Sequence, residues 1–319
     1  MMGGETMVSR VVVSSPATIA NLGPGFDVFG LALSEPVDMV EGRISGEPGV
    51  RVLDISGVGA DRIPKHHELN AVAIAALSAM KSLGREREGL EFMVKKGIRP
   101  GSGMGSSGAS AAAGAVIANE LLGGGLSEAQ LIAAAAEAEG RIAGTIHYDN
   151  VTPAIAGGFT IVTSTDPLEY LKLDPPPMKI VVALPELELP TRIARRILPE
   201  KVLIGDAVAN VGRASAMVAA LLSGDLRSFG KHMVDSIAEP LRAPMVPGFW
   251  DVKRAALEAG ALGAALAGSG PAIFAVADAN ADAEPIAEAM RDAFERSGVG
   301  CETIITTPGK GVRVVERGD

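Results

Sequence analysis

The densest group of residues that can do chemistry lies between Pro100 and Ser110, where the chain reads Pro-Gly-Ser-Gly-Met-Gly-Ser-Ser-Gly-Ala-Ser. Glycines let the backbone approach an anion closely and adopt positive φ angles, so successive amides can surround phosphate oxygens. An alanine-rich stretch follows to about Leu122 and predicts a helix, whose free N-terminal amides attract the same anion. We therefore predict a phosphate-binding loop, against the alternative of a flexible glycine turn before a helix.

This loop differs from two common nucleotide-binding loops. A Walker loop ends in Gly-Lys-Ser or Gly-Lys-Thr, and no lysine lies between Gly101 and Ser110. A dinucleotide-binding fingerprint needs an acidic residue after a second strand, and none follows at the right distance. The hydroxyl groups of Ser106 and Ser107 can instead bind phosphate or Mg²⁺.

Polar residues elsewhere have ordinary interpretations when each is taken alone. Arg195 lies in an arginine-rich segment, 191–197, where a solvated charged helix face is an equally good interpretation. Asp27 follows a glycine- and proline-rich sequence and can be a turn former. His147 alone suggests a buried, hydrogen-bonded histidine, and Glu139 alone suggests a surface acid at a helix end.

The elements that position these residues follow from hydrophobic spacing. Alternating or β-branched runs predict strands, and alanine- and leucine-rich stretches with helical spacing predict helices. The uncharged stretch 259–277 predicts a helix, a turn and a buried strand. Because strands and helices do not alternate strictly, we expect an α+β fold. The predicted strands are 11–13, 37–43, 50–55, 90–95, 179–184, 272–277 and 311–315; the predicted helices are 68–83, the stretch ending near 122, 127–139, 191–197, 204–223, 226–236, 249–259 and 283–296.

Length and composition favour two domains. The chain has 319 residues, of which 47% are hydrophobic and 21% charged, so it can bury a large core. Asp174 is followed by three prolines, which stiffen the chain and cannot donate hydrogen bonds to a sheet. We therefore predict a boundary there, with an N-terminal domain at 1–174 and a C-terminal domain at 175–319.

Charge and cysteine content argue against several classes of protein. The net charge is −9 and the chain has no run of five or more Lys or Arg, so we expect no nucleic-acid partner. The single cysteine, Cys301, cannot form an intrachain disulfide and is expected to be a small core or strand residue. Because no signal region or membrane span is recognisable, we expect no membrane partner and a cytoplasmic location.

Three segments together resemble the signature motifs of the GHMP kinases, a superfamily named after galactokinase, homoserine kinase, mevalonate kinase and phosphomevalonate kinase. The loop at 100–110 resembles the phosphate-binding motif, 15–27 resembles the first motif and 263–272 resembles the third. The three occur in the expected order and extend over most of the chain. The resemblance implies two domains, an N-terminal βαβ-type ATP-binding domain and a C-terminal ferredoxin-like α/β sandwich domain.

Further segments are similar to the homoserine kinase branch of this superfamily. They are Asn21-Leu-Gly-Pro-Gly-Phe-Asp27, His147-Tyr-Asp-Asn-Val-Thr-Pro153, and the stretches 189–199 and 235–249. The resemblance implies ATP-dependent phosphorylation of L-homoserine, in threonine biosynthesis, by a homodimer. Two alternatives remain: another GHMP kinase, such as the archaeal-type shikimate kinase, or a non-catalytic nucleotide- or metabolite-binding protein on this fold.

The resemblance also implies roles at the phosphate acceptor. The planar fork of an arginine suits the substrate carboxylate, and Arg195 and Arg242 are the candidates. The ammonium group is expected beside Asp27 and Asn21, and the hydroxyl end beside His147. The expected acceptor-binding residues are Asn21, Asp27, His147, Thr191, Arg195 and Arg242.

By the same resemblance, ATP and Mg²⁺ bind at the glycine loop. Glu139 and Ser106 are expected to hold Mg²⁺ between the β- and γ-phosphates, and Asn70 and 58–63 lie where the superfamily contacts the base. The expected ATP-binding residues are Asn70, Pro100, Gly101, Ser102, Gly103, Met104, Gly105, Ser106, Ser107, Gly108, Ala109 and Ser110.

Catalysis of phosphoryl transfer depends mainly on alignment and charge stabilisation. The expected catalytic residues are Glu139, His147 and Asn150. Some GHMP kinases have an aspartate base where Asn150 stands, and an amide cannot take a proton. We therefore predict that the substrate proton leaves to phosphate or solvent. Asp149 is the alternative base, although we favour a structural role for it.

Overall fold

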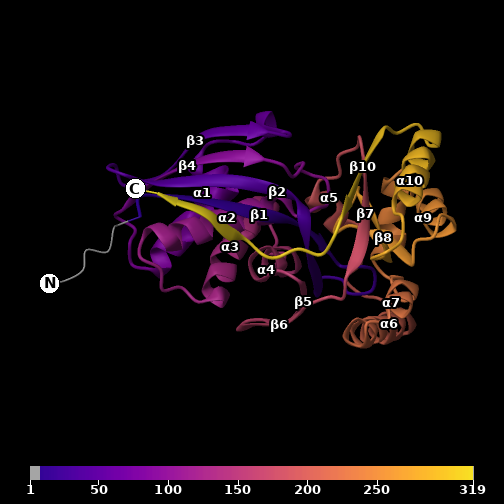
Figure 1. Cartoon of the computed structure of the whole chain (residues 1–319). Coiled ribbons are helices and arrows are strands. Elements are labelled where there is room, and N and C mark those ends of the chain that lie inside the picture. Colours follow the sequence, from indigo (N-terminus) through magenta and orange to yellow (C-terminus); the bar gives the residue numbers. More distant parts are fainter. Residues whose placement is uncertain (1–7, 319) are drawn as a thin grey trace.

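Two β-sheets covered by helices make up the chain (Figure 1). The computed structural model describes residues 8–318. The first sheet has seven strands in the order β11-β1-β2-β4-β3, with β5 paired to β2 and β6 paired to β5. Its strands are β1 (Arg10–Ala20), β2 (Phe29–Ser45), β3 (Gly49–Gly57), β4 (Gly89–Lys96), β5 (Phe159–Thr165), β6 (Leu168–Leu173) and β11 (Arg313–Gly318).

A β-α-β unit in the first sheet leads into the glycine loop. Strands β3 and β4 are parallel, and α1 (Ala71–Ser82) connects them. The other described strand pairs of this sheet are antiparallel. Because the loop follows β4 directly and α2 (Ser106–Leu121) follows the loop, both ends of the loop belong to regular elements.

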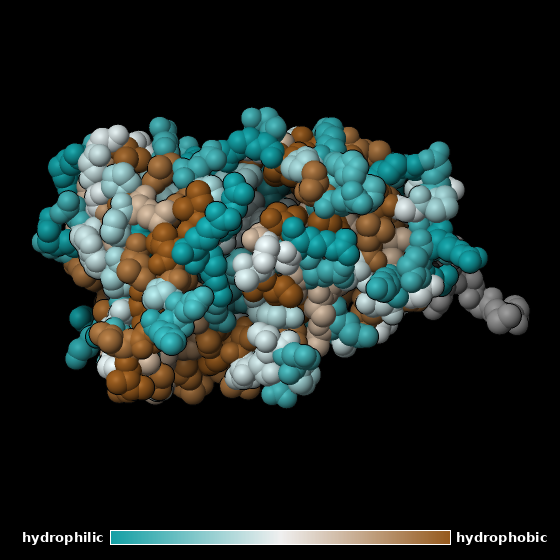
Figure 2. Space-filling view, turned by 180° about the vertical axis from the view of Figure 1, so that it is seen from behind, coloured by the Kyte–Doolittle hydropathy of each residue, from teal (hydrophilic) through white to brown (hydrophobic). Residues whose placement is uncertain are grey.

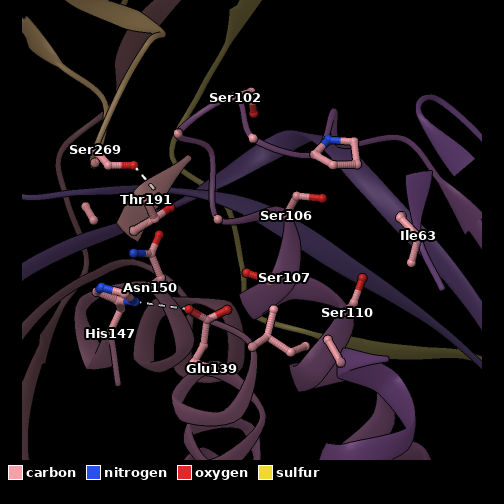
Figure 3. Close-up of a pocket in the computed structure, with 18 of the residues that line it drawn as sticks. Ile63, Ser102, Ser106, Ser107, Ser110, Glu139, His147, Asn150, Thr191 and Ser269 are labelled. Carbon is pink, nitrogen blue, oxygen red and sulfur yellow. Dashed lines mark hydrogen bonds and ion pairs between the residues drawn. The ribbon is translucent and has the colours of Figure 1, made fainter. Parts of the chain in front are cut away.

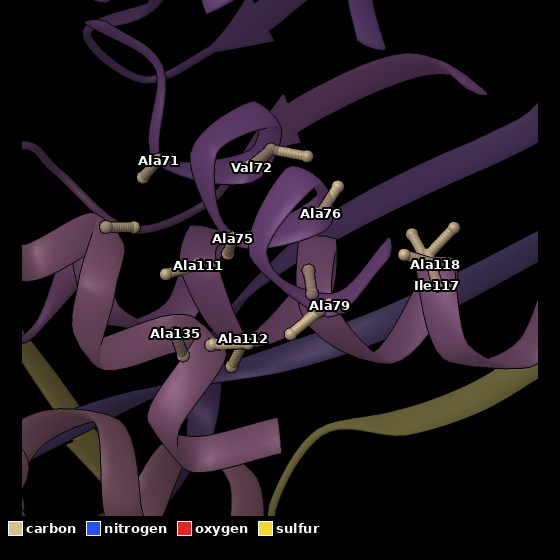
Figure 4. Packing of buried hydrophobic residues seen from close by; sticks show 14 of the residues in the cluster. Ala71, Val72, Ala75, Ala76, Ala79, Ala111, Ala112, Ile117, Ala118 and Ala135 are labelled. Atoms are coloured by element: carbon tan, nitrogen blue, oxygen red, sulfur yellow. The ribbon is translucent and has the colours of Figure 1, made fainter. Parts of the chain in front are cut away.

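Alanine-rich helices pack closely against one another beside this sheet (Figure 4). Helix α3 (Glu128–Ala143) joins α1 and α2 in this layer, and Ala75, Ala76 and Ala112 are among the fully buried residues. A Cβ atom on Gly114 of α2 would lie 2.2 Å from the carbonyl oxygen of Val72 in α1. Small side chains therefore allow the helix backbones to approach, which fixes the start of α2 relative to the sheet.

The second sheet has four strands in the order β10-β7-β9-β8, all antiparallel to their neighbours. With one crossover through helices between β7 and β8 and one through α10 between β9 and β10, this is a β-α-β-β-α-β arrangement. Helices α9 and α10 cover one face, and α6 and α7 cover part of the other. The elements are β7 (Met178–Pro185), β8 (Gly263–Leu266), β9 (Ile273–Asp278), β10 (Cys301–Thr306), α5 (Thr191–Arg196), α6 (Ile204–Ser223), α7 (Leu226–Lys231), α8 (Glu239–Arg242), α9 (Phe249–Glu258) and α10 (Glu284–Arg296).

The predicted fold class is confirmed, including the βαβ-type first half and the ferredoxin-like second half. Cys301 begins β10, as expected of a strand residue. The helix predicted at the start of 259–277 is wrong, because Gly263–Leu266 forms strand β8. A Cβ atom on Gly263 would lie 2.3 Å from the carbonyl oxygen of Gly230, so close packing of α7 on this strand requires the glycine.

Several short elements were not predicted from the sequence. Helix α4 (Tyr148–Ala156) contains Pro153, which obscures the helical pattern. The hairpin of β5 and β6 and the strand β10 are short and partly polar, and the helix predicted at 226–236 ends at Lys231. Within the described part of the chain, no helix is both long and apolar enough to cross a membrane.

The division into domains 1–174 and 175–319 stays a prediction. The chain passes from the first sheet to the second between β6 and β7, where the three prolines lie. However, β11 returns to the first sheet and pairs with β1. The C-terminal strand therefore packs with the first half, which the prolines could not indicate.

Candidate active site

An open cavity of about 320 Å³ contains most of the predicted site residues (Figure 3). Residues of the glycine loop and α3 line it from the first half, and residues of α5 and α8 line it from the second. Three predicted residues do not line it: Met104 and Ala109 are buried in the core, and Gly108 faces α4. The predicted residues that line it are Asn21, Asp27, Asn70, Pro100, Gly101, Ser102, Gly103, Gly105, Ser106, Ser107, Ser110, Glu139, His147, Asn150, Thr191, Arg195 and Arg242.

The glycine loop ends with free amides at the start of α2. Gly105 is the residue before the helix and has a φ angle of 64°, and no side chain of the described residues caps that helix end. Gly101 and Gly103 also have positive φ angles, of 72° and 87°. A helix N-terminus with uncapped amides and a positive dipole end is a suitable site for an anion.

The segment 263–272 packs directly against the backbone of the glycine loop. The backbone N–H of Ala272 donates to the carbonyl oxygen of Ser102 at 3.1 Å. A Cβ atom on Gly103 would lie 2.5 Å from the carbonyl oxygen of Ala267. These contacts explain why a glycine-rich segment far along the sequence accompanies the loop: both backbones need close approach.

A buried ion pair beneath the loop was missed by sequence reasoning. Lys96, at the end of β4, pairs with Asp38 of β2, and both side chains are almost fully buried. The ammonium group also donates to Ser110 Oγ at 2.8 Å and to the carbonyl oxygen of Ser106 at 3.1 Å. Burial lowers the pKa of Lys96, and the Asp38 carboxylate opposes that shift. Lys96 gave no signal in the sequence, because its partner Asp38 lies far away along the chain.

Glu139 and His147 meet at the junction of α3 and α4 (Figure 3). His147 Nδ1 lies 3.2 Å from Glu139 Oε2. Burial works against protonation of the imidazole, but the hydrogen bond and charge of Glu139 outweigh it and raise the pKa of His147. The second carboxylate oxygen, Glu139 Oε1, is buried and has no hydrogen-bond partner among residues 8–318. A buried polar atom without a hydrogen-bond partner is costly unless a ligand compensates it.

The two adjacent serines of the loop face different ways. Ser106 Oγ donates to the carbonyl oxygen of Ile98 at 3.0 Å. Figure 3 shows the Ser107 hydroxyl on the side of the cavity occupied by Glu139 and Asn150, whereas the Ser106 hydroxyl points away from them. Ser107 is therefore better placed than Ser106 to act together with Glu139.

Asn150 lies beside the loop, in the first turn of α4. Its Oδ1 accepts a hydrogen bond from Thr18 Oγ1 at 3.0 Å, which fixes the orientation of the amide. The NH₂ end is then the part of the side chain that can donate to a ligand. A Cβ atom on Gly105 would lie 2.0 Å from Thr18 Oγ1, so the loop, β1 and α4 meet here.

Asp149 is buried next to Asn150 and also lines the cavity. Burial, together with the nearby Asp27 carboxylate, raises the pKa of Asp149 to about 7. Its Oδ1 atom has no hydrogen-bond partner within the described chain. The interpretation of Asp149 as mainly structural, with a role as base as the alternative, stays a prediction.

At the far end of the cavity, Asp27 and Arg195 form an ion pair. Arg195 Nη1 donates to Asp27 Oδ2 at 2.5 Å. Asn21 Oδ1 accepts from the backbone N–H of Asp27 at 3.0 Å, and Asn21 Nδ2 donates to the carbonyl oxygen of Gly268 at 2.9 Å. Both Asn21 and Asp27 have positive φ angles, of 70° and 57°. Non-glycine residues keep such conformations only where surrounding contacts enforce them, often at functional sites.

Arg242, at the end of α8, lies beside Arg195 of α5. Its guanidinium donates to the carbonyl oxygens of Ala194 at 3.2 Å and Gly268 at 3.1 Å. Both guanidinium groups lie over the ring of Phe26, at 5.2 Å for Arg195 and 5.3 Å for Arg242. Burial lowers the pKa of Arg242. The ring of Phe26 therefore makes cation–π contacts with both guanidinium groups, a role that the sequence did not suggest for Phe26.

Thr191 and Asn70 complete the two ends of the cavity. Thr191 Oγ1 lies 3.4 Å from Ser269 Oγ, at the end near Arg195. Asn70 is the N-cap of α1: its Oδ1 accepts from the backbone N–H groups of Val72 and Ala73, and its Nδ2 donates to the carbonyl oxygen of Pro64 at 2.8 Å. Its hydrogen bonds therefore position the segment around Pro64, which lines the cavity.

Comparison with known proteins gives consistent matches over most of the chain. The family model described as "GHMP kinases N terminal domain" matches residues 70–158, and the one described as "GHMP kinases C terminal" matches residues 217–296. A homoserine kinase of Pyrococcus abyssi is 43% identical over 301 residues, covering 94% of this chain and 98% of the relative. A homoserine kinase of Thermococcus kodakarensis is 45% identical, covering 93% and 97%.

Solved structures show the same similarity. The crystal structure of homoserine kinase from Cytophaga hutchinsonii has 40% sequence identity and a TM-score of 0.92, and the match covers 99% of this chain and 100% of that one. A mevalonate kinase from L. major has 19% identity and a TM-score of 0.70, covering 93% and 95%, and shares the fold.

Proposed function

This chain belongs to the GHMP kinase family, and from that premise we propose that it is a homoserine kinase. It transfers the γ-phosphoryl group of ATP to the side-chain hydroxyl of L-homoserine, giving O-phospho-L-homoserine and ADP. This is a step of threonine biosynthesis. The archaeal-type shikimate kinase is not favoured, because the relatives that match at 40–45% identity are homoserine kinases.

One observation carries the proposal: a single cavity has an anion site at one end and an amino-acid site at the other. Uncapped amides at the start of α2 suit the ATP phosphates. Arg195, Arg242 and Asp27 present two guanidinium groups and a carboxylate to the same cavity. Those charges complement the carboxylate and the ammonium of an α-amino acid. Shikimate has a carboxylate and no ammonium, so it leaves Asp27 without a ligand.

Glu139 and Ser107 are proposed to hold Mg²⁺ beside the phosphates. The unpartnered Glu139 Oε1 supports this proposal, because a carboxylate and a hydroxyl oxygen are ligands that Mg²⁺ accepts together with phosphate oxygens. When bound there, Mg²⁺ supplies charge neutralisation at the phosphates. The described residues contain no cluster of three or more His, Cys, Asp or Glu that could hold a metal ion alone, which fits a site completed by ATP.

The reaction centre is proposed to lie between Asn150, His147 and the loop. Asn150 is oriented by Thr18, so its NH₂ group can donate to the acceptor hydroxyl or to a phosphate oxygen. His147 is held by Glu139 and can position the hydroxyl end of the substrate. Since an amide cannot accept the substrate proton, the proton leaves to phosphate or solvent, and alignment supplies most of the catalysis.

The adenine base is proposed to lie on the apolar wall around 58–64. Ile63, Leu69 and Val72 line this part of the cavity. Asn70 positions that wall through its hydrogen bonds to Pro64 and to the start of α1. We propose this supporting role in place of a direct contact with the base. We also propose that the chain acts as a homodimer in the cytoplasm, where ATP is available.

The test is ADP release measured with a panel of acceptors. L-Homoserine should support turnover, and shikimate should not. Two analogues separate the charged contacts: 3-amino-1-propanol lacks the carboxylate, and 4-hydroxybutyrate lacks the ammonium. Each should raise KM by about tenfold or more, because a lost charge-assisted hydrogen bond costs about 1.5–3 kcal/mol. Turnover with shikimate and none with homoserine would overturn the proposal.

A further inference from the structure

Arg242 belongs to a helix that is too short to hold its own position. Helix α8 has four residues, and a single helical turn forms too few hydrogen bonds to be stable alone. Arg242 is buried in the protein but lines the cavity, and it donates to the carbonyl oxygens of Ala194 and Gly268. Both acceptors are neutral, so they direct the guanidinium without neutralising its charge. Other contacts must therefore fix the helix itself.

The carboxylate of Asp235 fixes the start of α8. Its Oδ2 accepts from the backbone N–H groups of Ala238 at 2.9 Å and Glu239 at 2.7 Å. Its Oδ1 accepts from the backbone N–H of Ile237 at 2.7 Å and from Nδ2 of Asn210, in α6, at 2.7 Å. N–H groups at a helix start otherwise lack partners, so a carboxylate there stabilises the turn. Asp235 therefore caps α8 and ties it to α6.

Asn210 lies on the inner side of a helix whose outer side is apolar. Val208 and Val211 are 65% and 67% exposed, and the brown area at the lower left of Figure 2 lies where α6 is placed in that reversed view. A surface helix normally has the opposite polarity. Asn210 is buried and also accepts from the backbone N–H of Ser236 at 2.9 Å, and Arg213 donates to Ser236 Oγ at 2.6 Å. The polar side of α6 is therefore directed at the segment that leads into α8.

Glu239 fixes α8 at a second point. Its Oε2 accepts from the backbone N–H of Leu266, at the end of β8, at 2.9 Å. Its Oε1 pairs with Lys253 of α9 at 2.5 Å, and both side chains are mostly buried. Gly268, two residues after Leu266, accepts from Arg242 at 3.1 Å. Glu239 and Arg242 therefore hold the same short segment, 266–268, from the two ends of α8.

Asp235 and Glu239 reach Arg242 but not the site of the acceptor. Neither residue lines the cavity of the candidate active site, whereas Arg242 does. A separate cavity of only about 10 Å³ lies between the three residues, which is room for about one water molecule at most. Helix α8 thus has little space in which to shift, and its carboxylates can act on a ligand only through the arginine.

We propose that Asp235 and Glu239 are positioning residues, which hold α8 so that Arg242 meets the carboxylate of the acceptor. The proposal rests on the kinase function proposed above, and it extends acceptor recognition to two residues outside the cavity. A guanidinium that is held in place before the ligand arrives avoids the cost of ordering it on binding. Loss of either carboxylate should therefore weaken the binding of an acceptor that has a carboxylate and leave other acceptors unaffected.

The first test is the steady-state kinetics of a chain with Glu239→Ala and Lys253→Met. Replacing both partners leaves no unpaired charge in the interior, as a single replacement would. KM for L-homoserine should rise about tenfold, while kcat and KM for ATP change by less than about threefold. KM for 3-amino-1-propanol, which lacks the carboxylate, should not change. Equal changes in KM for the two acceptors, or none, would overturn the positioning role.

Two conservative variants refine this test. Glu239→Gln in the same Lys253→Met background keeps an oxygen for the N–H of Leu266, and should bring KM for L-homoserine to within about threefold of the unaltered chain. Asp235→Asn keeps one side-chain oxygen and loses the other, and should raise KM about threefold or more for L-homoserine alone. The control is Asp225→Ala, which removes the capping carboxylate of α7 and should leave KM for both acceptors unchanged.

A double-mutant cycle shows whether Glu239 acts through Arg242. Arg242→Ala removes the guanidinium, so adding the Glu239→Ala and Lys253→Met changes should raise KM for L-homoserine by no more than about twofold further. Effects on KM that multiply would show an independent action of Glu239 and would overturn the proposal. An unaltered chain that does not phosphorylate L-homoserine would instead refute the kinase function, so the two failures are distinguishable.

Discussion

Arg195 donates to Asp27 at 2.5 Å, so the groups proposed to bind the carboxylate and the ammonium of the substrate are paired with each other. Their side chains are 35% and 38% exposed, and ion pairs with that access to water contribute little to stability. The pair can therefore open at low cost. When a zwitterionic amino acid binds, the Arg195–Asp27 ion pair is replaced by two ion pairs with the ligand. Arg195 then pairs with the ligand carboxylate and Asp27 with the ligand ammonium, so neither side chain loses a partner.

Arg195→Ala should raise KM for L-homoserine about 10- to 100-fold and leave KM for ATP unchanged. The loss of a charge-assisted hydrogen bond of about 1.5–3 kcal/mol accounts for the change. The control is Arg196→Ala, an exposed neighbour on the same helix, which should have no effect. Steady-state kinetics with each substrate varied in turn measures both. Equal effects in the two variants would contradict the binding role and support the alternative interpretation of Arg195 as part of a solvated charged helix face.

Gly105→Ala should abolish most kinase activity, while Gly101→Ala should reduce it only modestly. Both glycines have positive φ angles, of 64° and 72°, so alanine at either position bears the cost of roughly 1–2 kcal/mol for the left-handed conformation. At Gly105 the new methyl group would lie 2.0 Å from Thr18 Oγ1 and 2.9 Å from Asn150 Oδ1. Nothing lies within 4 Å at Gly101. Calorimetry should show that nucleotide affinity falls more in Gly105→Ala than in Gly101→Ala. Equal losses of affinity in the two variants would mean that the contact with Thr18 is unimportant.

Ser107→Ala should raise the Mg²⁺ concentration needed for half-maximal activity by about tenfold, as expected for the loss of a ligand or its supporting hydrogen bond. Ser106→Ala should leave that concentration unchanged and lower the free energy of unfolding by about 1 kcal/mol, because its hydroxyl donates to Ile98 inside the protein. Mg²⁺ titrations and urea unfolding distinguish the two serines. The opposite result would restore Ser106, the residue predicted from the sequence, as the metal ligand.

Asn150→Ala should lower kcat about 100-fold without changing its pH profile. The amide aligns a reacting group and takes no proton, so its removal deletes no titrating residue. Asn150→Asp is the matched variant, since it places a carboxylate at the same position and should add an acidic limb to the profile. A new pH dependence in the alanine variant would argue for a proton-transfer role.

The free energy of unfolding of the unaltered protein should fall as pH rises. In the Asp149→Asn variant it should fall less. Burial raises the pKa of Asp149 from 3.8 to about 7, so the folded state holds its proton more tightly than the unfolded state. This stabilisation is complete below about pH 3.8 and is lost as pH rises through about 7. Urea unfolding without ATP or Mg²⁺ should show that the unaltered chain loses on the order of 3 kcal/mol more than the variant between pH 5 and pH 8. Parallel curves would contradict the assignment.

Local patterns in the sequence determined the fold class and predicted the loop that we propose as the anion site. The glycine loop is contiguous, and its position between an alternating strand and an alanine-rich helix can be read without knowing what packs on it. The long helices, such as Ile204–Ser223, were likewise predicted from a repeated hydrophobic spacing. Short elements such as β8 were not, because four apolar residues fit a strand and a helix equally well.

Only the tertiary structure decided which polar residues act together. Asp27 and Arg195 are far apart in the sequence, and nothing local distinguishes Arg195 from the solvent-exposed Arg196 next to it. The Lys96–Asp38 pair, the ring of Phe26 under two arginines and the opposite directions of Ser106 and Ser107 depend equally on distant backbone. The physical reason is that hydrogen bonds and charges act over a few ångströms of space, whereas sequence patterns report only a residue's neighbours along the chain.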